Sequence, residues 1–427
     1  MARPRKNAVK AQYSLVKTEE VIEIPVEEQP YPLPEGWKWV RLSSLCSLRN
    51  GKAFKPSDWS DSGLPIVRIQ NLNNPDSKFN YYNGHVEDKF LIKSGDLLFA
   101  WSGTPGTSFG AHIWLGEKAV LNQHIFRMDF EEKIILKSFF RYSINCRLEE
   151  LISKAHGGAG LQHITKGVFE STPIALPTLT EQQRIVDRIE SLFAKLDDAK
   201  AKAEAVLEGF EIRKAAILHK AFTGELTAKW REKKEESFDY WKKTPLGKIL
   251  KVASGKGLTS KNMDLGGKIP VYGGNGITGY HNQSNVAKDT IVIGRVGYYC
   301  GSVYYVKKEA WVTDNALIVS FDKKKFDVFF IFYLLLYTNL RQNDSSTAQP
   351  VISGSKIYPI EVTIMPLPEQ QEIVRILDNL LAKEQRVKES AENVLNQIDL
   401  MKKAILAKAF RGELGTHIPS QTNPQRN

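Results

Sequence analysis

Two stretches of 46 residues decide the architecture of this chain. The first, residues 181–226, reads EQQRIVDRIESLFAKLDDAKAKAEAVLEGFEIRKAAILHKAFTGEL. The second, residues 369–414, reads EQQEIVRILDNLLAKEQRVKESAENVLNQIDLMKKAILAKAFRGEL. The two align without a gap, and 23 of the 46 positions are identical. Identity of this extent indicates an internal duplication. A duplication constrains the architecture, because both copies are expected to form the same structure.

Apolar residues recur in both stretches at alternating spacings of four and three, which is typical of a coiled-coil seam. No proline interrupts either stretch, so each predicts a helix of about 40 residues, about 60 Å long at about 1.5 Å per residue. One charged residue breaks each seam, Arg213 in the first copy and Glu384 in the second. Each helix could pack on its own domain, but we expect the two copies to pack on each other, antiparallel. The residues expected at this interface are Ile185, Ile189, Leu192, Leu196, Val206, Phe210, Ile373, Leu377, Leu380, Val394, Ile398 and Ile405.

The regions before the two stretches also correspond, more loosely. The matched positions are Trp37, Leu42, Gly51 and Lys52 with Trp241, Leu246, Gly255 and Lys256; Asp96-Leu97-Leu98-Phe99 with Asp289-Thr290-Ile291-Val292; Phe139-Phe140 with Phe329-Phe330; and Ile164-Thr165 with Ile352-Ser353. The order along the chain is therefore a variable region, a shared helix, a second variable region and the second copy of the helix.

The variable regions mix short strands with single helices, which predicts an α+β fold for each. Runs of apolar or β-branched residues bounded by turn residues indicate strands at 64–69, 96–100, 119–121, 290–293 and 316–319. Helices are expected around 138–153 and 327–339. The expected organisation is an N-terminal tail (1–32), a first globular domain (33–178), a first helical spacer (179–230), a second globular domain (231–366), a second helical spacer (367–414) and a C-terminal tail (415–427).

The composition favours an acidic partner in the cytoplasm. The formal net charge is +11 and the pI is about 9.2, and nucleic acid is the commonest partner of so basic a protein. The three cysteines, Cys46, Cys146 and Cys300, form no CxxC pair, so neither a zinc site nor a disulfide framework is expected. Residues 1–10 lack the apolar core of a secretion signal, and the longest apolar run, 328–337, is shorter than the roughly 20 residues of a membrane span.

Polar and aromatic residues gather in the loops that follow the expected strands. Gln, Asn and Arg side chains can make paired hydrogen bonds to base edges. Ordinary surface loops are polar too, so both interpretations stay open for any single residue. The candidate DNA-binding residues are Arg68, Gln70, Asn71, Trp101, Ser102, Gln123, His124, Gln162, His163, Lys256, Tyr272, Asn275, Arg295, Tyr298, Asn315 and Gln349.

The sequence carries no GxxxxGK[ST] phosphate loop, no [ND]PP[YF] run of an amino-methyltransferase and no HExxH metal motif. We therefore expect no catalytic residue and no metal ligand in this chain. The alternative is a Mg²⁺-dependent nuclease, because Pro75-Asp76 followed by Glu87-Asp88-Lys89 fits a loose PD…ExK pattern. That pattern is degenerate, and the first part of it also indicates a turn. A coiled-coil scaffold that binds no DNA is a second alternative.

Several motifs together resemble the specificity subunit of type I restriction-modification systems. The resemblance covers about residues 33–414, and the paired helical stretches are its most specific part. The matching motifs are Leu33-Pro34-Glu35-Gly36-Trp37, Gly95-Asp96-Leu97-Leu98, Glu181-Gln182-Gln183-Arg184-Ile185-Val186, Ala221-Phe222-Thr223-Gly224-Glu225-Leu226-Thr227-Ala228-Lys229-Trp230, Pro366-Leu367-Pro368-Glu369-Gln370-Gln371 and Lys408-Ala409-Phe410-Arg411-Gly412-Glu413-Leu414.

The resemblance implies a non-catalytic subunit with two target-recognition domains separated by two helices. It implies double-stranded DNA, two methyltransferase subunits and ATP-driven translocase/nuclease subunits as partners, with no membrane. S-adenosylmethionine, ATP and Mg²⁺ are expected on those partners and none on this chain, and methylation is expected at adenine. Because the two variable regions differ, the implied DNA site is bipartite and asymmetric, with half-sites about one DNA turn (roughly 34–36 Å) apart. The charged tail at 1–32 precedes the usual start of the family.

Overall fold

The computed structural model describes residues 21–74, 76–158, 161–234, 240–264, 266–342 and 350–415. Contacts divide the chain into two compact units. Unit 1 comprises residues 1–201 and 394–427, and unit 2 comprises residues 202–393. Because the last part of the chain returns to the first unit, each unit contains one variable region and segments from both duplicated stretches. Within the described ranges, no helix combines the length and the apolar character that a membrane span needs.

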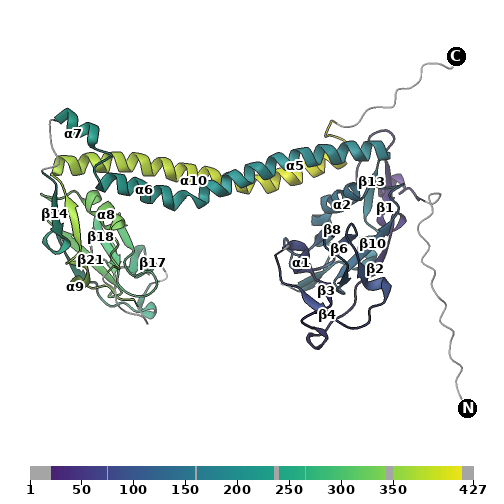
Figure 1. Ribbon diagram of the computed structural model, residues 1–427, viewed down its shortest axis with the longest axis horizontal. Coiled ribbons are helices and arrows are strands. Elements are labelled where there is room, and N and C mark those ends of the chain that lie inside the picture. Colours follow the sequence, from purple (N-terminus) through teal and green to yellow (C-terminus); the bar gives the residue numbers. More distant parts are fainter. Residues whose placement is uncertain are drawn as a thin grey trace, which may run out of the picture. The chain divides into compact units, whose positions relative to one another are not determined.

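Unit 1 is built around a four-stranded antiparallel sheet with α2 beside it (Figure 1). Its order is β2 (Cys46–Asn50), β10 (Ile125–Phe130), β6 (Leu97–Ala100), β8 (Gly110–Ile113). A second sheet has the order β4 (Asn80–Tyr82), β3 (Leu64–Val67), β9 (Ala119–Leu121), β5 (Leu91–Ile92), with β3 and β9 parallel. The remaining elements are β1 (Lys38–Arg41), β7 (Ser102–Gly103), β11 (His156–Gly158), β12 (Leu161–His163), β13 (Pro173–Leu176), α1 (Ile69–Asn73), α2 (Lys137–Cys146), α3 (Leu148–Ser153) and α4 (Lys166–Glu170).

Unit 2 repeats this plan. Its four-stranded sheet has the order β15 (Leu250–Ser254), β21 (Ala316–Phe321), β18 (Thr290–Gly294), β19 (Val303–Val306). A three-stranded sheet has the order β17 (Gly276–His281), β16 (Ile269–Gly273), β20 (Trp311–Val312), with β16 and β20 parallel. The remaining elements are β14 (Lys242–Pro245), β22 (Glu361–Ile364), α7 (Ala228–Lys234), α8 (Val328–Tyr337) and α9 (Gly354–Ile357).

One inner strand of each four-stranded sheet, β6 in unit 1 and β18 in unit 2, has an apolar middle because both of its faces are buried. In β6, Leu97 and Phe99 belong to the main core of unit 1, whereas Leu98 belongs to a smaller core with Val67 and Leu121. Side chains alternate between the two faces of a strand, so successive residues enter different cores. In β18, Ile291 and Ile293 belong to the main core of unit 2, and Val292 belongs to the smaller one.

The strand register corrects one of the matches made from sequence, and ring contacts correct a second. Ala100 pairs with Ile125 as Gly294 pairs with Ala316, so Leu97 is equivalent to Ile291 and not to Thr290. Phe139 contacts Phe410, and Phe330 contacts Phe222, so Phe139 is equivalent to Phe330 and not to Phe329. Both errors are one residue long. A one-residue slip exchanges the two faces of a strand, and identity of residue type alone does not reveal it.

The duplicated stretches form α5 (Leu179–Glu208) with α6 (Phe210–Phe222), and α10 (Leu367–Phe410). The first copy is interrupted at Gly209, where a Cβ would lie 2.4 Å from Arg213 Nη1. The Arg213 side chain donates to the Val206 carbonyl and forms an ion pair with Glu384 at 2.7 Å. The two charged residues that break the seams are therefore each other's partners.

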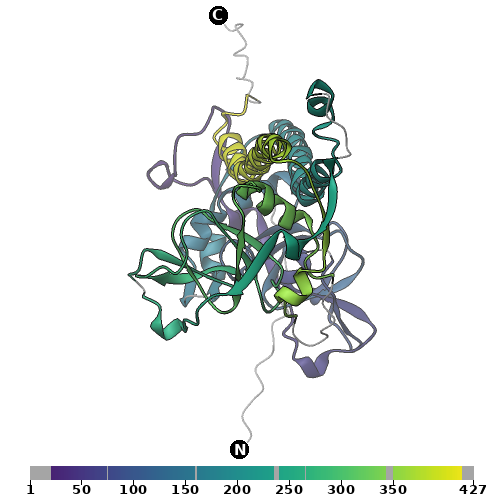
Figure 2. The same ribbon diagram turned by 90° about the vertical axis from the view of Figure 1, so that its left-hand side faces the viewer.

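Within each unit the two copies run antiparallel (Figure 1), and Figure 2 shows helices of the two copies end-on. In unit 1, Ile185 and Ile189 share a core with Ala409 and Phe410, and farther along the pair Lys402 bonds Asp197 at 2.6 Å. In unit 2, Leu218 and Phe222 share a core with Ile373 and Leu377, and Arg213 pairs with Glu384. In both units the residue number rises along one helix as it falls along its neighbour.

The expected seam residues fall into different environments. Four of them, Ile185, Ile189, Ile373 and Leu377, are fully buried in the core of a globular unit as well as facing the other helix. Ile398 is 3% exposed, whereas Val394 is 39% exposed. Leu192, Leu196, Val206, Phe210, Leu380 and Ile405 are half-buried.

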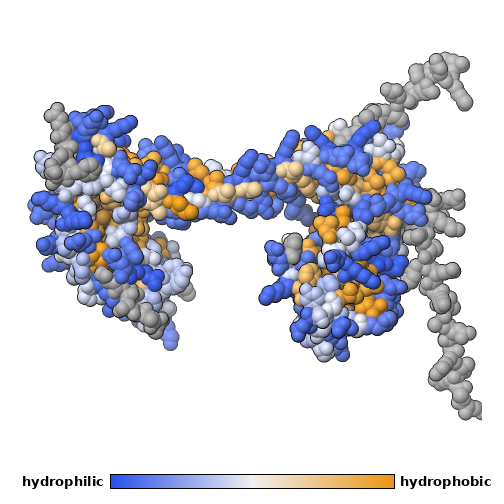
Figure 3. Space-filling model, viewed as in Figure 1, coloured by the Kyte–Doolittle hydropathy of each residue, from blue (hydrophilic) through white to orange (hydrophobic). Residues whose placement is uncertain are grey.

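Along α10 one heptad column is buried and the other is exposed. Ala391 and Ile398 are 7% and 3% exposed, and Val387, Val394 and Met401, also seven residues apart, are 47%, 39% and 47% exposed. A two-helix pair covers only part of the circumference of each helix, so the second apolar column faces solvent. Figure 3 shows apolar residues at the surface of the helices.

His112 on β8 gives unit 1 an expected pH dependence. Burial lowers the pKa of His112 to about 4, and the Arg141 guanidinium adds to the effect. The fold therefore favours neutral His112, and its contribution is full above pH 6.5 and is lost as the pH falls toward 4. We expect up to about 3 kcal/mol of unfolding free energy to depend on this group. Guanidinium unfolding at pH 7 and pH 4.5 checks this, because the His112→Gln variant should lose less stability between these pH values. An equal loss would contradict the assignment.

Candidate nucleic-acid interface

Both units bring three segments together at one end of the four-stranded sheet. In unit 1, β2 and β6 end where β10 begins, and the turn after β2 is Gly51-Lys52. The amide of Gly51 donates to the Ile125 carbonyl at 3.2 Å, and the amide of Lys52 donates to the Leu121 carbonyl at 2.8 Å. In unit 2 the same bonds join Gly255 to Ala316 at 3.1 Å and Lys256 to Val312 at 3.0 Å.

The glycine of this turn has a steric cause. A Cβ on Gly51 would lie 2.1 Å from the Asn122 carbonyl oxygen, and one on Gly255 would lie 2.2 Å from the Val312 carbonyl oxygen. Only glycine permits this approach of two backbones. Lys52 and Lys256, which follow these glycines, therefore lie at equivalent places in the two units.

In unit 1 this place holds a cluster of rings around Trp101. The indole centroid lies 5.4 Å from His124, 5.8 Å from His163 and 5.6 Å from Phe126. The indole Nε1 donates to Asn50 Oδ1 at 3.3 Å, and the Gln123 amide nitrogen lies 3.2 Å from His124 Nε2. Trp101, His124 and His163 are half-buried, and Phe126 is buried.

Three polar atoms of this cluster lack a hydrogen-bond partner among the described residues: His124 Nδ1, His163 Nδ1 and Gln162 Oε1. Burial lowers the pKa of His124, and the neighbouring His163 lowers it further. His124 is therefore held neutral at pH 7, with one ring nitrogen a donor and the other an acceptor. Such groups are suited to hydrogen bonds with a ligand that excludes water from them.

Lys52 sits beside this cluster on a second aromatic pair. Its Nζ lies 3.0 Å from the Tyr82 hydroxyl and 4.3 Å from the centre of the Tyr82 ring, with Phe54 also within 5.4 Å. The two rings hold the ammonium group, which forms no salt bridge with the residues that the structure describes, although its charge acts on exposed Glu87 and helps to lower the pKa of that carboxyl. A lysine in such a position is suited to a phosphate.

The other unit 1 candidates are farther from this cluster or used within the fold. Arg68 donates to Asn80 Oδ1 at 3.3 Å and stacks over Trp59, and Gln70 is exposed. The buried Asn71 caps α1 through the Arg68 amide and donates to the Ser77 and Lys78 carbonyls. Ser102 is 3% exposed and lies in β7.

In unit 2 the corresponding place holds Arg295. Its Nη1 donates to Ser254 Oγ at 3.1 Å and to the Asp314 carbonyl at 3.3 Å, and its Nε has no hydrogen-bond partner among the described residues. Asn315 is exposed next to it, and Tyr298 is 83% exposed. Lys256 is also exposed.

The remaining candidates of the second half of the chain are Tyr272, Asn275 and Gln349. Tyr272 is half-buried, 6.3 Å from the Tyr304 ring, and burial raises its pKa. Asn275 is exposed in the turn between β16 and β17. Gln349 lies outside the described residues.

The candidates chosen from sequence omitted Asn50, Ser254 and Lys52. Asn50 and Ser254 end equivalent strands and hold Trp101 and Arg295, which only the strand register reveals. Lys52 could have been found, because Gly51-Lys52 and Gly255-Lys256 match in the two copies.

The residues of the nuclease pattern are not gathered into a site. Asp76 is exposed in a turn after α1, and exposed Glu87 pairs with Lys89 at 2.8 Å. Among the residues that the structure describes, no group of three or more His, Cys, Asp or Glu side chains could share a metal ion.

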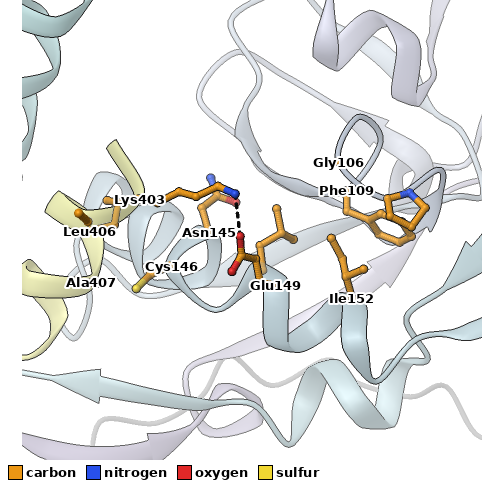
Figure 4. Close-up of a pocket in the computed structure, with 12 residues that line it drawn as sticks. Gly106, Phe109, Asn145, Cys146, Glu149, Ile152, Lys403, Leu406 and Ala407 are labelled. Carbon is orange, nitrogen blue, oxygen red and sulfur yellow. Dashed lines mark hydrogen bonds and ion pairs between the residues drawn. The ribbon is translucent and has the colours of Figure 1, made fainter. Parts of the chain in front are cut away.

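A groove of about 640 Å³ lies elsewhere in unit 1, between α2–α3 and the last turns of α10 (Figure 4). Its lining is mainly apolar, with Phe109, Ile152 and Leu406, and Lys403 pairs with Glu149 at its edge. The cluster around Trp101 contributes no residue to it.

The chain is similar to known proteins over most of its length. The family model of the type I restriction modification DNA specificity domain matches residues 34–208 and 239–397. The type I restriction enzyme EcoKI specificity subunit of Escherichia coli strain K12 is 26% identical over 428 residues, covering 90% of this chain and 90% of that protein. The EcoBI specificity subunit of Escherichia coli is 24% identical over 418 residues, covering 89% and 86%.

Solved structures share the fold. A chain from a study of complex assembly and conformational transition of the type I R-M system has a TM-score of 0.71 at 20% identity, covering 90% of this chain and 100% of that one. The HsdS subunit from Thermoanaerobacter tengcongensis has a TM-score of 0.59 at 20% identity, covering 91% and 100%.

Proposed function

Because this chain belongs to the family of type I restriction modification DNA specificity domains, we propose that each of its two units reads one half of a bipartite DNA site. The chain supplies sequence-specific DNA recognition to a type I restriction-modification complex. The observation that carries the proposal is that both units contain the same set of backbone hydrogen bonds around the Gly-Lys turn, which we call the frame. The frame holds unlike side chains in the two units. One frame used twice gives two reading sites, and unlike side chains make the DNA site asymmetric.

The charges support DNA as the ligand. The chain has a net charge of +11, and Lys52 and Lys256 occupy the same place beside the reading residues. Lysine contacts to phosphate supply affinity that does not depend on sequence, whereas side chains at base edges supply specificity.

The exposed apolar column of α10 supports partner subunits along the helices. Val387, Val394 and Met401 are about half exposed, and Leu400 and Ile212 are 65% and 74% exposed. Exposed apolar residues in such a row are typical of a protein interface. Methyltransferase and restriction subunits are the partners of this family, and the duplicated helices offer related surfaces to two copies.

We further propose that the chemistry belongs to those partners. In this proposal S-adenosylmethionine, ATP and Mg²⁺ bind the partner subunits, adenine is the methylated base, and this chain contributes no catalytic residue.

Exchanging residues 34–175 for the first domain of another specificity subunit tests the two-unit proposal. The exchanged chain is co-expressed with the methyltransferase partner, and methylated adenines are mapped across the genome. We expect one half-site to change and the other to stay as it was, because each unit has its own frame. A change in both half-sites, or in neither, would refute the proposal.

A further inference from the structure

Trp101 and Arg295 occupy the same position in the two units. The amide of Trp101 donates to the His124 carbonyl at 3.2 Å, and the amide of Arg295 donates to the Asn315 carbonyl at 3.0 Å. The carbonyl of Trp101 accepts from Ile164 at 2.9 Å, and that of Arg295 accepts from Ile352 at 2.8 Å. Because each residue makes the same two backbone hydrogen bonds, Trp101 has the same position relative to the sheet of unit 1 as Arg295 has relative to the sheet of unit 2.

Their side chains are also held in the same way. The Trp101 indole donates to Asn50, the last residue of β2, and the Arg295 guanidinium donates to Ser254, the last residue of β15. Asn50 pairs with Phe126 and Ser254 with Leu317, which are the second residues of equivalent strands. The frame therefore directs position 101 and position 295 toward the same place.

Around this position some side chains are shared and others differ. The lysine of the turn is common to both units, Lys52 and Lys256. The neighbours differ. His124 corresponds to Asn315, because each accepts the backbone bond from position 101/295. His163 corresponds to Val351, because His163 pairs with Ser102 as Val351 pairs with Val296. A residue that is the same in both units cannot make them read different bases, whereas a residue that differs can.

The hydrogen bonds of Arg295 within the fold leave N–H donors that can bind a guanine. Its two hydrogen-bond partners are a hydroxyl and a carbonyl, so neither neutralises its charge, and both bind Nη1. Its Nε has no partner among the described residues. The edge formed by the buried Nε and by Nη2 therefore has no hydrogen-bond partner among the described residues. Paired donation from arginine to O6 and N7 of guanine in the major groove is its commonest specific contact.

Trp101 presents different chemistry at the same place. Its only donor is used by Asn50, so the indole offers an apolar surface to a ligand. Apolar contact in the major groove selects the methyl group of thymine. His124 and His163, whose Nδ1 atoms are unpaired among the described residues, flank it.

We propose that position 101/295 is a specificity-determining position of each unit, where Arg295 reads a guanine and Trp101 contacts a thymine methyl, while Lys52 and Lys256 hold phosphates. This inference rests on the proposed function and adds the residue and base class that each unit uses at this point.

The test uses the full chain assembled with its methyltransferase partner. Binding is measured on DNA duplexes in which each base pair of the half-site read by unit 2 is replaced in turn. For Arg295→Gln we expect the preference for guanine at one position to fall about 5- to 150-fold, which corresponds to about 1–3 kcal/mol. The half-site read by unit 1 should be unaffected. Trp101→Ala should relax one thymine position of that other half-site only.

Lys256→Gln is the matched control, because it lies in the same frame. It should weaken binding to all sequences alike and reduce the slope of log affinity against log salt by about 1. Ser254→Ala is a second test that keeps the charge of Arg295 but removes its anchor, and we expect a partial loss of the same guanine preference. Thermal unfolding of each complex identifies a variant that has lost its fold.

The outcomes separate the inference from the proposed function. Unchanged preference at every position in folded Arg295→Gln, or uniform weakening like that of Lys256→Gln, would overturn the inference. Neither result touches the two-unit proposal, which fails only if exchange of residues 34–175 leaves both half-sites unchanged or alters both.

Discussion

Replacing Glu369 with glutamine is expected to lower the unfolding free energy of unit 2 by about 3–5 kcal/mol. Glu369 is 1% exposed and forms an ion pair with Arg231, which is 4% exposed. It also accepts from the Thr227 hydroxyl at 2.7 Å and the Trp241 indole at 2.8 Å. Glutamine keeps the shape of the side chain but removes the negative charge that pairs with the buried Arg231.

The duplication supplies a matched control at the equivalent position of the other copy. Glu181 is 5% exposed, but its ionic partner Arg184 has a side chain that is 44% exposed, and Glu181 Oε1 has no partner among the described residues. Glu181→Gln should therefore change stability by less than about 1 kcal/mol. Hydrogen exchange of amides in β14 and β1 reports on the two units separately. Equal effects of the two substitutions would refute the role assigned to the Arg231–Glu369 pair.

Phe410→Ala is expected to destabilise unit 1 by about 3–5 kcal/mol, although residue 410 ends the last helix. Phe410 is 4% exposed, its ring lies 5.2 Å from that of Phe139, and its carbonyl accepts from the Tyr31 hydroxyl at 3.1 Å. The substitution leaves a cavity in the main core of unit 1. Amides of β1 and β13 should exchange faster, whereas those of β14 and β22 should not.

Leu400→Ala on the same helix is the control, because Leu400 is 65% exposed. Leu400→Ala should change the unfolding free energy of unit 1 by no more than about 0.5 kcal/mol. If Phe410→Ala were as mild, α10 would not be an integral part of the unit 1 core.

The duplication and the heptad spacing were enough to predict the helices, their antiparallel pairing within each unit and the α+β regions before them. Heptad spacing says that a face is apolar but not what covers it. It therefore could not separate Ile185 and Ile373, which belong to globular cores, from Val394, which is exposed. Nor could matching of residue types identify Ile291 as the equivalent of Leu97, because two apolar runs align equally well when one is shifted by one residue.

The candidate interface was only partly predictable for a related reason. Trp101 and Arg295 stood out as polar or aromatic residues directly after an expected strand. Their equivalence depends on hydrogen bonds to residues far away in sequence, such as Asn50 and Ser254. Asn71 looked the same as the others in sequence, but its side-chain bonds hold α1 in place.

The path of α10 has a consequence for biosynthesis. Its final turns complete the core of unit 1, so the unit that the ribosome makes first lacks part of its interior until residues 394–415 have left the exit tunnel. Domains generally fold in the order of their synthesis, but here the first unit must wait for residues 394–415. A premature stop codon before codon 394 would therefore damage the unit whose other residues are translated first.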